Sequence, residues 1–252
     1  LKLFADYYNA VPGGLVNDRW NQVPAIKRAI MRLPGVRGAV NRKAIEAFVG
    51  GSTSPMLPPH YDFVTPEYAS LDHITAHKWE STRGVGRSFA YNRFEPDKLA
   101  LTVPELVSSF VDIISKNGNL LLNVGPTSTG EIPAIQRRLL EGFGDWMHRY
   151  APAVKGSRPW TRFGDDEAGA PRVRFTRSGD DLNVFLFPGE TNEVSVSGIR
   201  IGADVLPQSL TTGAPADVRV DGTTARFTNV APDEAGTHVI VIPGGAQKRA
   251  GR

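Results

Sequence analysis

The sequence contains no cysteine among its 252 residues. Disulfides, thiolate nucleophiles and cysteine-based zinc sites are therefore excluded. No run of about 18 apolar residues occurs, so the sequence predicts no membrane-spanning helix. Neither sign of charge predominates, because 29 basic residues against 26 acidic ones give a formal net charge of only +3. The two basic stretches, residues 27–43 and the last few residues (Lys248, Arg249 and Arg252), contain no interleaved aromatic residues, so the sequence predicts no nucleic-acid groove.

The first residues, Leu1 to Phe4, have neither an initiating methionine nor the charged-then-apolar pattern of a secretory signal. Their pattern is typical of the middle of a helix, so we expect the chain to be a fragment of a longer protein. Any targeting segment would then lie upstream. Secreted, periplasmic and cytoplasmic locations all remain open.

A helix is predicted over Val103–Lys116, where apolar residues recur at helical spacing. Thr102 and Glu105 have the spacing of a capping box at its start, and Gly118 follows its end. The apolar run Asn119–Val124 comes next and predicts a strand buried on both faces. Helix followed by buried strand is the order of an α/β barrel or a doubly wound sheet.

The pattern changes near residue 160. A second helix, predicted over Pro133–Arg149, is the last segment with helical periodicity. Beyond it, short alternating stretches are separated by Gly, Pro or Asp, which is typical of a β-sandwich. These predicted strands are Arg172–Arg177, Leu182–Phe187, Glu193–Ser197, Val218–Val220, Ala225–Thr228 and His238–Ile242. We expect an α/β domain over residues 1–160, a β-sandwich domain over 161–243 and a disordered tail over 244–252.

Two charged residues at predicted strand ends are candidates for binding or catalysis. Arg19 follows a short strand and precedes Trp20, and a guanidinium there can grip sugar hydroxyls or a carboxylate from two sides. An ordinary ion pair with Asp18 is the alternative. Glu67 follows a proline-stiffened extended segment between aromatic residues, surroundings that suit a general acid. A solvated loop glutamate is the alternative there.

Further polar and aromatic residues lie in the same half of the chain. Trp79 beside Glu80 offers an apolar plate for a sugar face and an acceptor for its hydroxyls, whereas a place in the core is the alternative for the tryptophan. Asn123 ends a predicted strand and either faces a site or caps a turn. His73 and His77 have the spacing of a zinc-binding helix, but no third ligand is apparent, so we predict no metal site.

Six segments of the first 160 residues form an ordered set. They are Phe4–Asn9, Val16–Trp20, Asp62–Tyr68, Lys78–Glu80, Gly86–Asn92 and Asn119–Pro126. Together they resemble the α-L-fucosidases of glycoside hydrolase family 29. The similarity covers most of residues 1–160, ends around Tyr150–Trp160 and is weaker in the predicted sandwich.

The resemblance implies that the chain holds the C-terminal part of a (β/α)8-like barrel followed by a β-sandwich. It implies retaining exo-hydrolysis of terminal α-L-fucosyl linkages in an oligosaccharide or glycoconjugate, without a cofactor. Carried onto this sequence, Glu67 matches the general acid/base and Arg19 matches a residue that holds fucose. Trp79 matches a residue that packs against the sugar, and Glu80 beside it is a further substrate-binding candidate, ranked below Glu67 for the acid/base role.

The sequence departs from the family in two places. The family's nucleophile is an aspartate upstream of the helix that begins this chain, and residues 1–17 contain only Asp6, in a helical pattern. We therefore expect the nucleophile to lie outside this chain and the isolated chain to be inactive. The second departure is a basic insert of about residues 21–61 between Arg19 and Glu67, which is longer than the family's usual loop.

Two other functions remain compatible with the sequence. One is a non-catalytic carbohydrate-binding protein, and the other is a glycosidase of the same kind with a different sugar specificity. Neither a nucleic acid nor a membrane is expected as a partner, and a homo-oligomer remains open.

Overall fold

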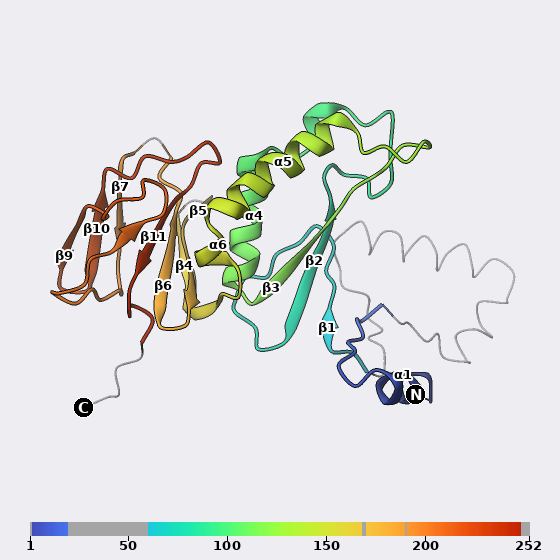
Figure 1. Cartoon of the computed structure of the whole chain (residues 1–252), viewed down its shortest axis with the longest axis horizontal. Coiled ribbons are helices and arrows are strands. Elements are labelled where there is room, and N and C mark those ends of the chain that lie inside the picture. The colour runs from blue at the N-terminus through green and yellow to red at the C-terminus, as the bar shows by residue number, and fades with distance from the viewer. Residues whose placement is uncertain (1, 20–59, 168–169, 190, 248–252) are drawn as a thin grey trace, which may run out of the picture. The chain divides into compact units, whose positions relative to one another are not determined.

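The computed structural model describes residues 2–19, 60–167, 170–189 and 191–247 (Figure 1). Most of the insert predicted at about 21–61 lies outside these ranges. The chain divides into two compact units. Unit 1 comprises Leu1–Ala69 and His77–Thr82, and unit 2 comprises Ser70–Ala76 and Arg83–Arg252.

Unit 1 contains a helix and a pair of parallel strands. Helix α1 (Lys2–Ala10) is followed by an extended segment, and strand β1 (Phe63–Val64) pairs in parallel with strand β2 (Lys78–Gly84), most of which belongs to this unit. An isolated parallel bridge joins Asn17 to Phe63. The segment after α1 therefore lies beside β1, although some forty residues of sequence separate them.

Unit 2 begins its helical part with α4 (Val103–Ser115), which confirms the first predicted helix. The capping box is present, because the Thr102 backbone N–H donates to Glu105 Oε2 at 2.8 Å and the Glu105 N–H donates to Thr102 Oγ1 at 3.4 Å. The end of the helix differs from the prediction. Asn117, with φ of 72°, is the left-handed residue there, and Gly118 belongs to the next strand.

Replacing Thr102 by alanine is expected to lower the free energy of unfolding of the chain by about 1 kcal/mol, because an N-cap side chain contributes about that much. Urea denaturation followed by circular dichroism measures the change. Ser108→Ala, in the middle of the same helix, is the matched control and should change the free energy by less than about 0.5 kcal/mol. Equal losses in the two variants would contradict the stabilising role of the cap.

Strand β3 (Gly118–Asn123) confirms the predicted strand, shifted by one residue. It is not buried on both faces, since Leu121 is 43% exposed. Helix α5 (Ala134–Arg149) also confirms its prediction and buries Leu139 and Trp146. Two short helices, η1 (Asp97–Leu99) and α6 (Ala151–Val154), complete the helical part. The sheets formed by the described residues are open, so the (β/α)8-like barrel remains a prediction.

The rest of unit 2 consists of two antiparallel sheets. A five-stranded sheet has the order β4-β5-β6-β11-β8, and a three-stranded sheet has the order β7-β10-β9. The strands are β4 (Arg158–Glu167), β5 (Ala170–Ser178), β6 (Asp181–Leu186), β7 (Glu193–Val196), β8 (Gln208–Ser209), β9 (Val218–Asp221), β10 (Thr224–Thr228) and β11 (His238–Ile242). All six predicted strands are present, whereas β4 and β8 were not predicted.

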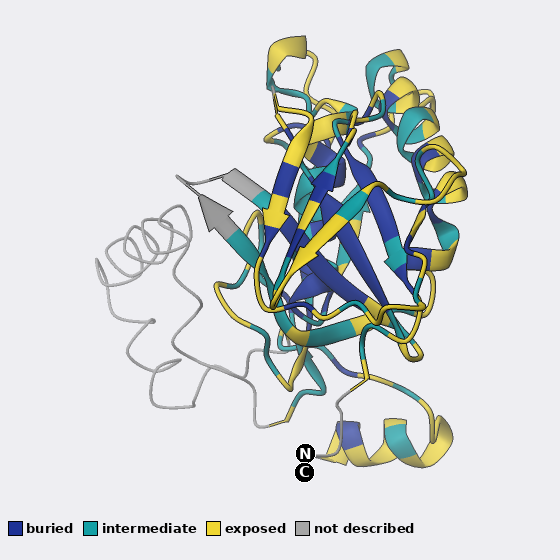
Figure 2. Ribbon diagram, turned by 90° about the vertical axis from the view of Figure 1, so that its left-hand side faces the viewer, coloured by how far each residue is buried: buried dark blue, intermediate teal, exposed yellow. Residues whose placement is uncertain are grey.

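The five-stranded sheet is covered on both faces. Alternate residues of β6, such as Val184 and Leu186, pack into a core cluster with residues of the three-stranded sheet. Phe185, which points to the opposite face, packs instead with Val107 of α4 and Trp146 of α5. Figure 2 accordingly shows strands that are buried along most of their length, other strands with exposed stretches in front of them, and helices whose outer faces are exposed. Unit 2 therefore has three layers, namely helices, sheet and sheet.

Polar contacts also join the helical layer to the sandwich. The Trp146 indole N–H donates to Thr237 Oγ1 at 2.9 Å, and the Tyr150 hydroxyl donates to Asp233 Oδ2 at 2.8 Å. Burial, reinforced by the Asp233 carboxylate, raises the pKa of Tyr150 to about 12. Both side chains are buried, so these bonds satisfy polar groups that would otherwise be left unpaired.

The chain after β11 is partly described. Residues 244–247, which we expected to belong to a disordered tail, form a turn against the β5–β6 hairpin, and the Ala246 N–H donates to the Asp180 carbonyl at 2.9 Å. Residues 248–252 lie outside the described ranges.

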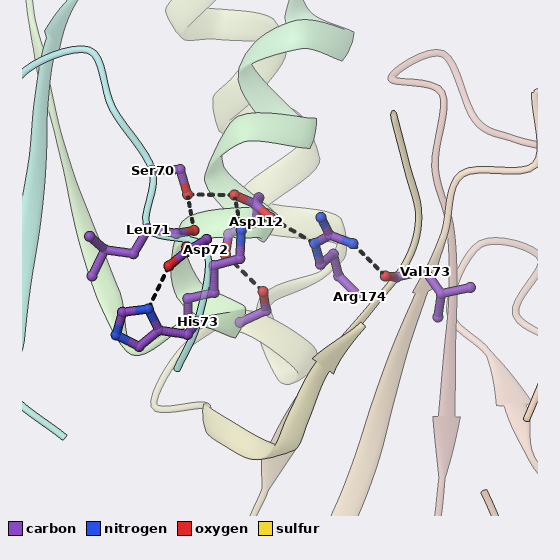
Figure 3. Close-up of polar contacts among 9 residues, drawn as sticks. Ser70, Leu71, Asp72, His73, Asp112, Val173 and Arg174 are labelled. Atoms are coloured by element: carbon purple, nitrogen blue, oxygen red, sulfur yellow. Dashed lines mark hydrogen bonds and ion pairs between the residues drawn. The ribbon is translucent and has the colours of Figure 1, made fainter. Parts of the chain in front are cut away.

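A buried group of charges connects α4 to the sandwich (Figure 3). The Asp112 carboxylate accepts from Arg174 Nε of β5 at 2.7 Å, from Lys116 Nζ at 2.9 Å and from Ser70 Oγ at 2.5 Å. The side chains of Arg174 and Lys116 are 3% and 7% exposed. Burial raises the pKa of Asp112, but the hydrogen bonds from Lys116, Ser70 and Arg174 outweigh it and leave the pKa below its ordinary value. Asp112 is therefore the shared anion of two buried cations.

Candidate active site

Arg19 and Glu67 come together in unit 1 because their segments run in parallel. Besides the bridge at Asn17, the Asp62 N–H donates to the Val16 carbonyl at 2.8 Å. Arg19 and Glu67 each follow the paired region by a few residues. Their side chains therefore lie beyond the carboxyl ends of parallel segments, where α/β enzymes carry their sites.

The two side chains form an ion pair. Arg19 Nη1 donates to Glu67 Oε1 in a short contact. The other edge of the guanidinium is bound by Thr65, since Nε donates to Thr65 Oγ1 at 2.8 Å and Nη2 donates to the Thr65 carbonyl at 2.9 Å. The Arg19 side chain is 43% exposed and that of Glu67 is 19% exposed. The pair is thus ordered by protein contacts while part of it stays accessible to a ligand.

The backbone around Glu67 is fixed by β2. Glu67 forms a parallel bridge with Thr82, and two hydrogen bonds flank it, from the Tyr68 N–H to the Thr82 carbonyl at 3.0 Å and from the Thr82 N–H to the Pro66 carbonyl at 2.9 Å. Tyr68 has φ of 49°, which lies in the left-handed region that residues other than glycine rarely adopt. Residues held in this way cluster at functional sites.

The other two predicted sugar contacts lie on β2. Trp79 is fully buried, so its indole packs inside the chain and is not offered to solvent. Glu80 is half-buried, and the alternation of a strand places it on the opposite face from Trp79. The structure therefore brings Arg19 and Glu67 together, whereas the burial of Trp79 favours its alternative role in the core. The sugar-contact roles of Trp79 and Glu80 remain predictions.

The structure adds a cluster that the sequence did not indicate. His60 Nε2 lies 3.0 Å from the Tyr8 hydroxyl and 3.7 Å from Asp62 Oδ1. The Tyr8 hydroxyl donates to Asp62 in a short contact, and the Val16 N–H donates to the same carboxylate at 2.7 Å. These bonds hold the pKa of Asp62 below its ordinary value, which suits an anchor for α1 better than a proton donor.

The side chains of Asn123 and His73 are hydrogen-bonded to other groups of the protein. The Asn123 amide donates to the Phe89 carbonyl in a short contact, which agrees with its turn-capping alternative. His73 lies beside Asp72, with Nδ1 2.5 Å from Asp72 Oδ1. Among the described residues, no group of three or more His, Asp or Glu side chains is arranged to hold a metal ion. Within the same ranges, no helix is long and apolar enough to cross a membrane.

Unit 2 has an open groove of about 770 Å³ beside α4. Its lining includes Asp112 and the two buried cations that bind it, Lys116 and Arg174, together with Glu105 and Phe187. The cations are committed to Asp112 and lie mostly below the surface. This groove therefore offers little for catalysis, and unit 1 holds the better candidate site.

Comparison with known proteins gives a consistent result. Residues 38–152 match the family described as alpha-L-fucosidase. Human plasma α-L-fucosidase is 33% identical over 175 residues, which cover 69% of this chain and 36% of that protein. A Dictyostelium discoideum α-L-fucosidase is 34% identical over 99 residues, or 37% of this chain and 21% of that protein.

Solved structures extend the similarity to nearly the whole chain. The Thermotoga maritima α-fucosidase, solved in complex with a mechanism-based inhibitor, is 32% identical with a TM-score of 0.69 and covers 96% of this chain. The match takes up 48% of the Thermotoga chain, so this chain spans about half the length of that enzyme. An α-L-fucosidase isoenzyme from Paenibacillus thiaminolyticus, at 20% identity and a TM-score of 0.67, shows the same fold.

Proposed function

Because this chain belongs to the α-L-fucosidase family, we propose that it supplies the general acid/base and part of the sugar-binding site of a retaining α-L-fucosidase. The contact between Arg19 and Glu67 carries the proposal, since two motifs 48 residues apart in sequence converge there on one ion pair. The substrate is a terminal α-L-fucosyl group on an oligosaccharide or glycoconjugate. No cofactor is required by this chemistry.

Glu67 has two tasks in this reaction. As an acid it gives its proton to the glycosidic oxygen while the bond from that oxygen to the anomeric carbon breaks and a carboxylate nucleophile bonds to the carbon. As a base it then takes a proton from the water that displaces the nucleophile. Arg19 lies against the same carboxylate and has donors that suit sugar hydroxyls. Glu80 can accept from further hydroxyls, and Trp79 supports β2 from inside.

The nucleophile comes from polypeptide outside this chain. Retaining hydrolysis needs a second carboxyl group about 5–5.5 Å from the first. Two aspartates of unit 1 that lie in the neighbouring segments are already bound within the fold. Asp18 accepts from the Thr65 hydroxyl, and Asp62 accepts from Tyr8 and from the Val16 N–H.

The isolated chain is therefore expected not to hydrolyse 4-nitrophenyl α-L-fucoside above the buffer rate, because the proposed nucleophile lies outside it. A chimera in which the uncovered part of the Thermotoga maritima enzyme precedes residue 1 should hydrolyse it, because that part would supply the other half of the site. Release of 4-nitrophenol measures both.

Three results would redirect the proposal. Turnover by the isolated chain that Glu67→Gln abolishes would contradict the external nucleophile. Fucose binding by the chimera in calorimetry, without turnover, would favour a carbohydrate-binding protein. Turnover of another aryl glycoside in preference to the fucoside would favour a different sugar specificity.

A further inference from the structure

Thr65 binds the edge of Arg19 that faces away from Glu67. Its hydroxyl oxygen accepts from Arg19 Nε at 2.8 Å, and its carbonyl accepts from Arg19 Nη2 at 2.9 Å. The residue itself is buried. Two parallel bonds from one residue fix both the position and the plane of the guanidinium.

Asp18 in turn fixes Thr65. Asp18 Oδ1 accepts from the Thr65 backbone N–H at 3.0 Å and from the Thr65 hydroxyl at 2.7 Å. A hydroxyl has one hydrogen to donate. Because Asp18 takes that hydrogen, the oxygen of Thr65 can meet Arg19 only as an acceptor, which is what a guanidinium requires. Asp18, next to Arg19 in sequence, thus acts on it through a residue 47 positions away in the chain.

The arrangement decides which donors of Arg19 are left for a ligand. A guanidinium has five N–H groups. Within the described residues, two of them are bound by Thr65 and one by Glu67. Apart from contacts with residues that the structure does not describe, one N–H on each terminal nitrogen remains for a ligand.

We infer that Thr65 and Asp18 are positioning residues, which hold Arg19 so that it presents these two donors to the sugar and keeps the Glu67 carboxylate in place. The inference rests on the proposed function for its sugar, but the contacts between Asp18, Thr65 and Arg19 can be tested without any substrate.

A purely structural role for Asp18 and Thr65 would be to join two segments of unit 1. Backbone contacts already do this, through the bridge from Asn17 to Phe63 and the bond from the Asp62 N–H to the Val16 carbonyl. Loss of the Thr65 hydroxyl should therefore leave the segments paired and free the guanidinium edge. This separates a positioning role from a structural one.

The test is nuclear magnetic resonance of the 252-residue chain with ¹⁵N-labelled arginine, in which Arg19→Lys identifies the Arg19 Nε–H signal. Thr65→Val keeps the shape of the side chain without its hydroxyl and should speed exchange of this proton with water roughly fivefold, the factor for a net hydrogen bond of about 1 kcal/mol. Thr65→Ser keeps the hydroxyl and should restore slow exchange. Asp18→Ala should speed exchange, and Asp18→Asn, which still accepts, should restore it.

Thr82→Val is the matched control, because Thr82 is in the same unit and contributes backbone bonds to its neighbours. It should leave the Arg19 signal unchanged. The inference fails if Thr65→Val leaves Arg19 exchange at its original rate. It also fails if Thr65→Val removes the dispersed signals of unit 1, since the hydroxyl would then be needed for folding and not for positioning.

A second measurement connects the contact to catalysis. In the chimera, Thr65→Val should lower kcat/KM for the aryl fucoside roughly tenfold at unchanged melting temperature, and Thr65→Ser should recover most of it. A chimera that hydrolyses no fucoside would count against the proposed function alone, because the exchange rates are measured on the chain without substrate.

Discussion

Replacing Glu67 by alanine in the chimera is expected to lower kcat/KM for fucosides with poor leaving groups roughly 100- to 10,000-fold, which corresponds to about 3–5 kcal/mol of transition-state stabilisation. The leaving oxygen of such a substrate needs the proton that Glu67 gives. The leaving group of an activated aryl fucoside needs this proton less, so the variant should cleave the glycosidic bond of that substrate at a rate closer to the parent's. The rate loss should then appear mainly in the second step, the attack of water, where Glu67 acts as a base. Initial rates with both kinds of substrate measure the difference.

Azide provides the control for this interpretation. It attacks carbon without first losing a proton, so it does not need the base that Glu67→Ala removes. Added azide should raise turnover of the aryl fucoside by the variant and give a fucosyl azide, which mass spectrometry detects. Glu141→Gln, on the exposed face of α5, should retain full activity without azide. A Glu67→Ala chimera that is inactive and unresponsive to azide would show that Glu67 has another role.

Local signals predicted much of unit 2. The apolar stripe, the capping residues and the length of helix α4 are all set by one continuous stretch of sequence. The observed helix agrees with the prediction within one residue. Its end was less predictable, because Asn117 takes the left-handed conformation and donates its side-chain amide to the Thr75 carbonyl at 2.8 Å. That bond comes from a residue 42 positions away in the chain and leaves no mark in the local pattern.

The two strands of the sandwich that were not predicted, β4 and β8, depend on distant partners. β4 contains Pro159 and Gly164, both of which argue against a strand in a local reading. The structure accommodates them with a shift of register against β5 between these two positions. β8 has only two residues, which is too short for any periodicity. In both cases the strand is defined by its pairing with another strand, and that pairing cannot be predicted from the local sequence.

The candidate site also combines features that the local sequence indicates with contacts that depend on distant residues. Arg19 and Glu67 were predicted as site residues because the ordered motifs that contain them resemble the family, since their own surroundings left alternatives open. The bond from Arg19 to Thr65 depends on the register between two segments 46 residues apart, which a single sequence does not reveal. For Trp79 the sequence left both a sugar contact and a place in the core open. Alternation along β2 turns the indole inward, which favours the core.

Replacing Asp112 by alanine is expected to lower the free energy of unfolding of the chain by about 3–5 kcal/mol, because it removes the carboxylate that two buried cations share. Arg174 and Lys116 are almost fully buried and both bind this carboxylate. The exposed pair of Glu193 and Arg226 offers a matched control in the same unit. Glu193→Ala should lower the free energy by no more than about 1 kcal/mol. Equal effects in urea denaturation would contradict the importance of burial.

The effect should also depend on pH in a defined direction. The folded pKa of Asp112 lies below its ordinary value. Its stabilisation is therefore fully present above the unfolded pKa of about 3.9 and is lost as pH falls through the lower folded pKa. The difference in unfolding free energy between the parent chain and Asp112→Asn should accordingly be constant near neutral pH and shrink at acid pH. A difference that persists unchanged down to pH 2 would show that shape and packing, not the charge of Asp112, hold the helix to the sheet.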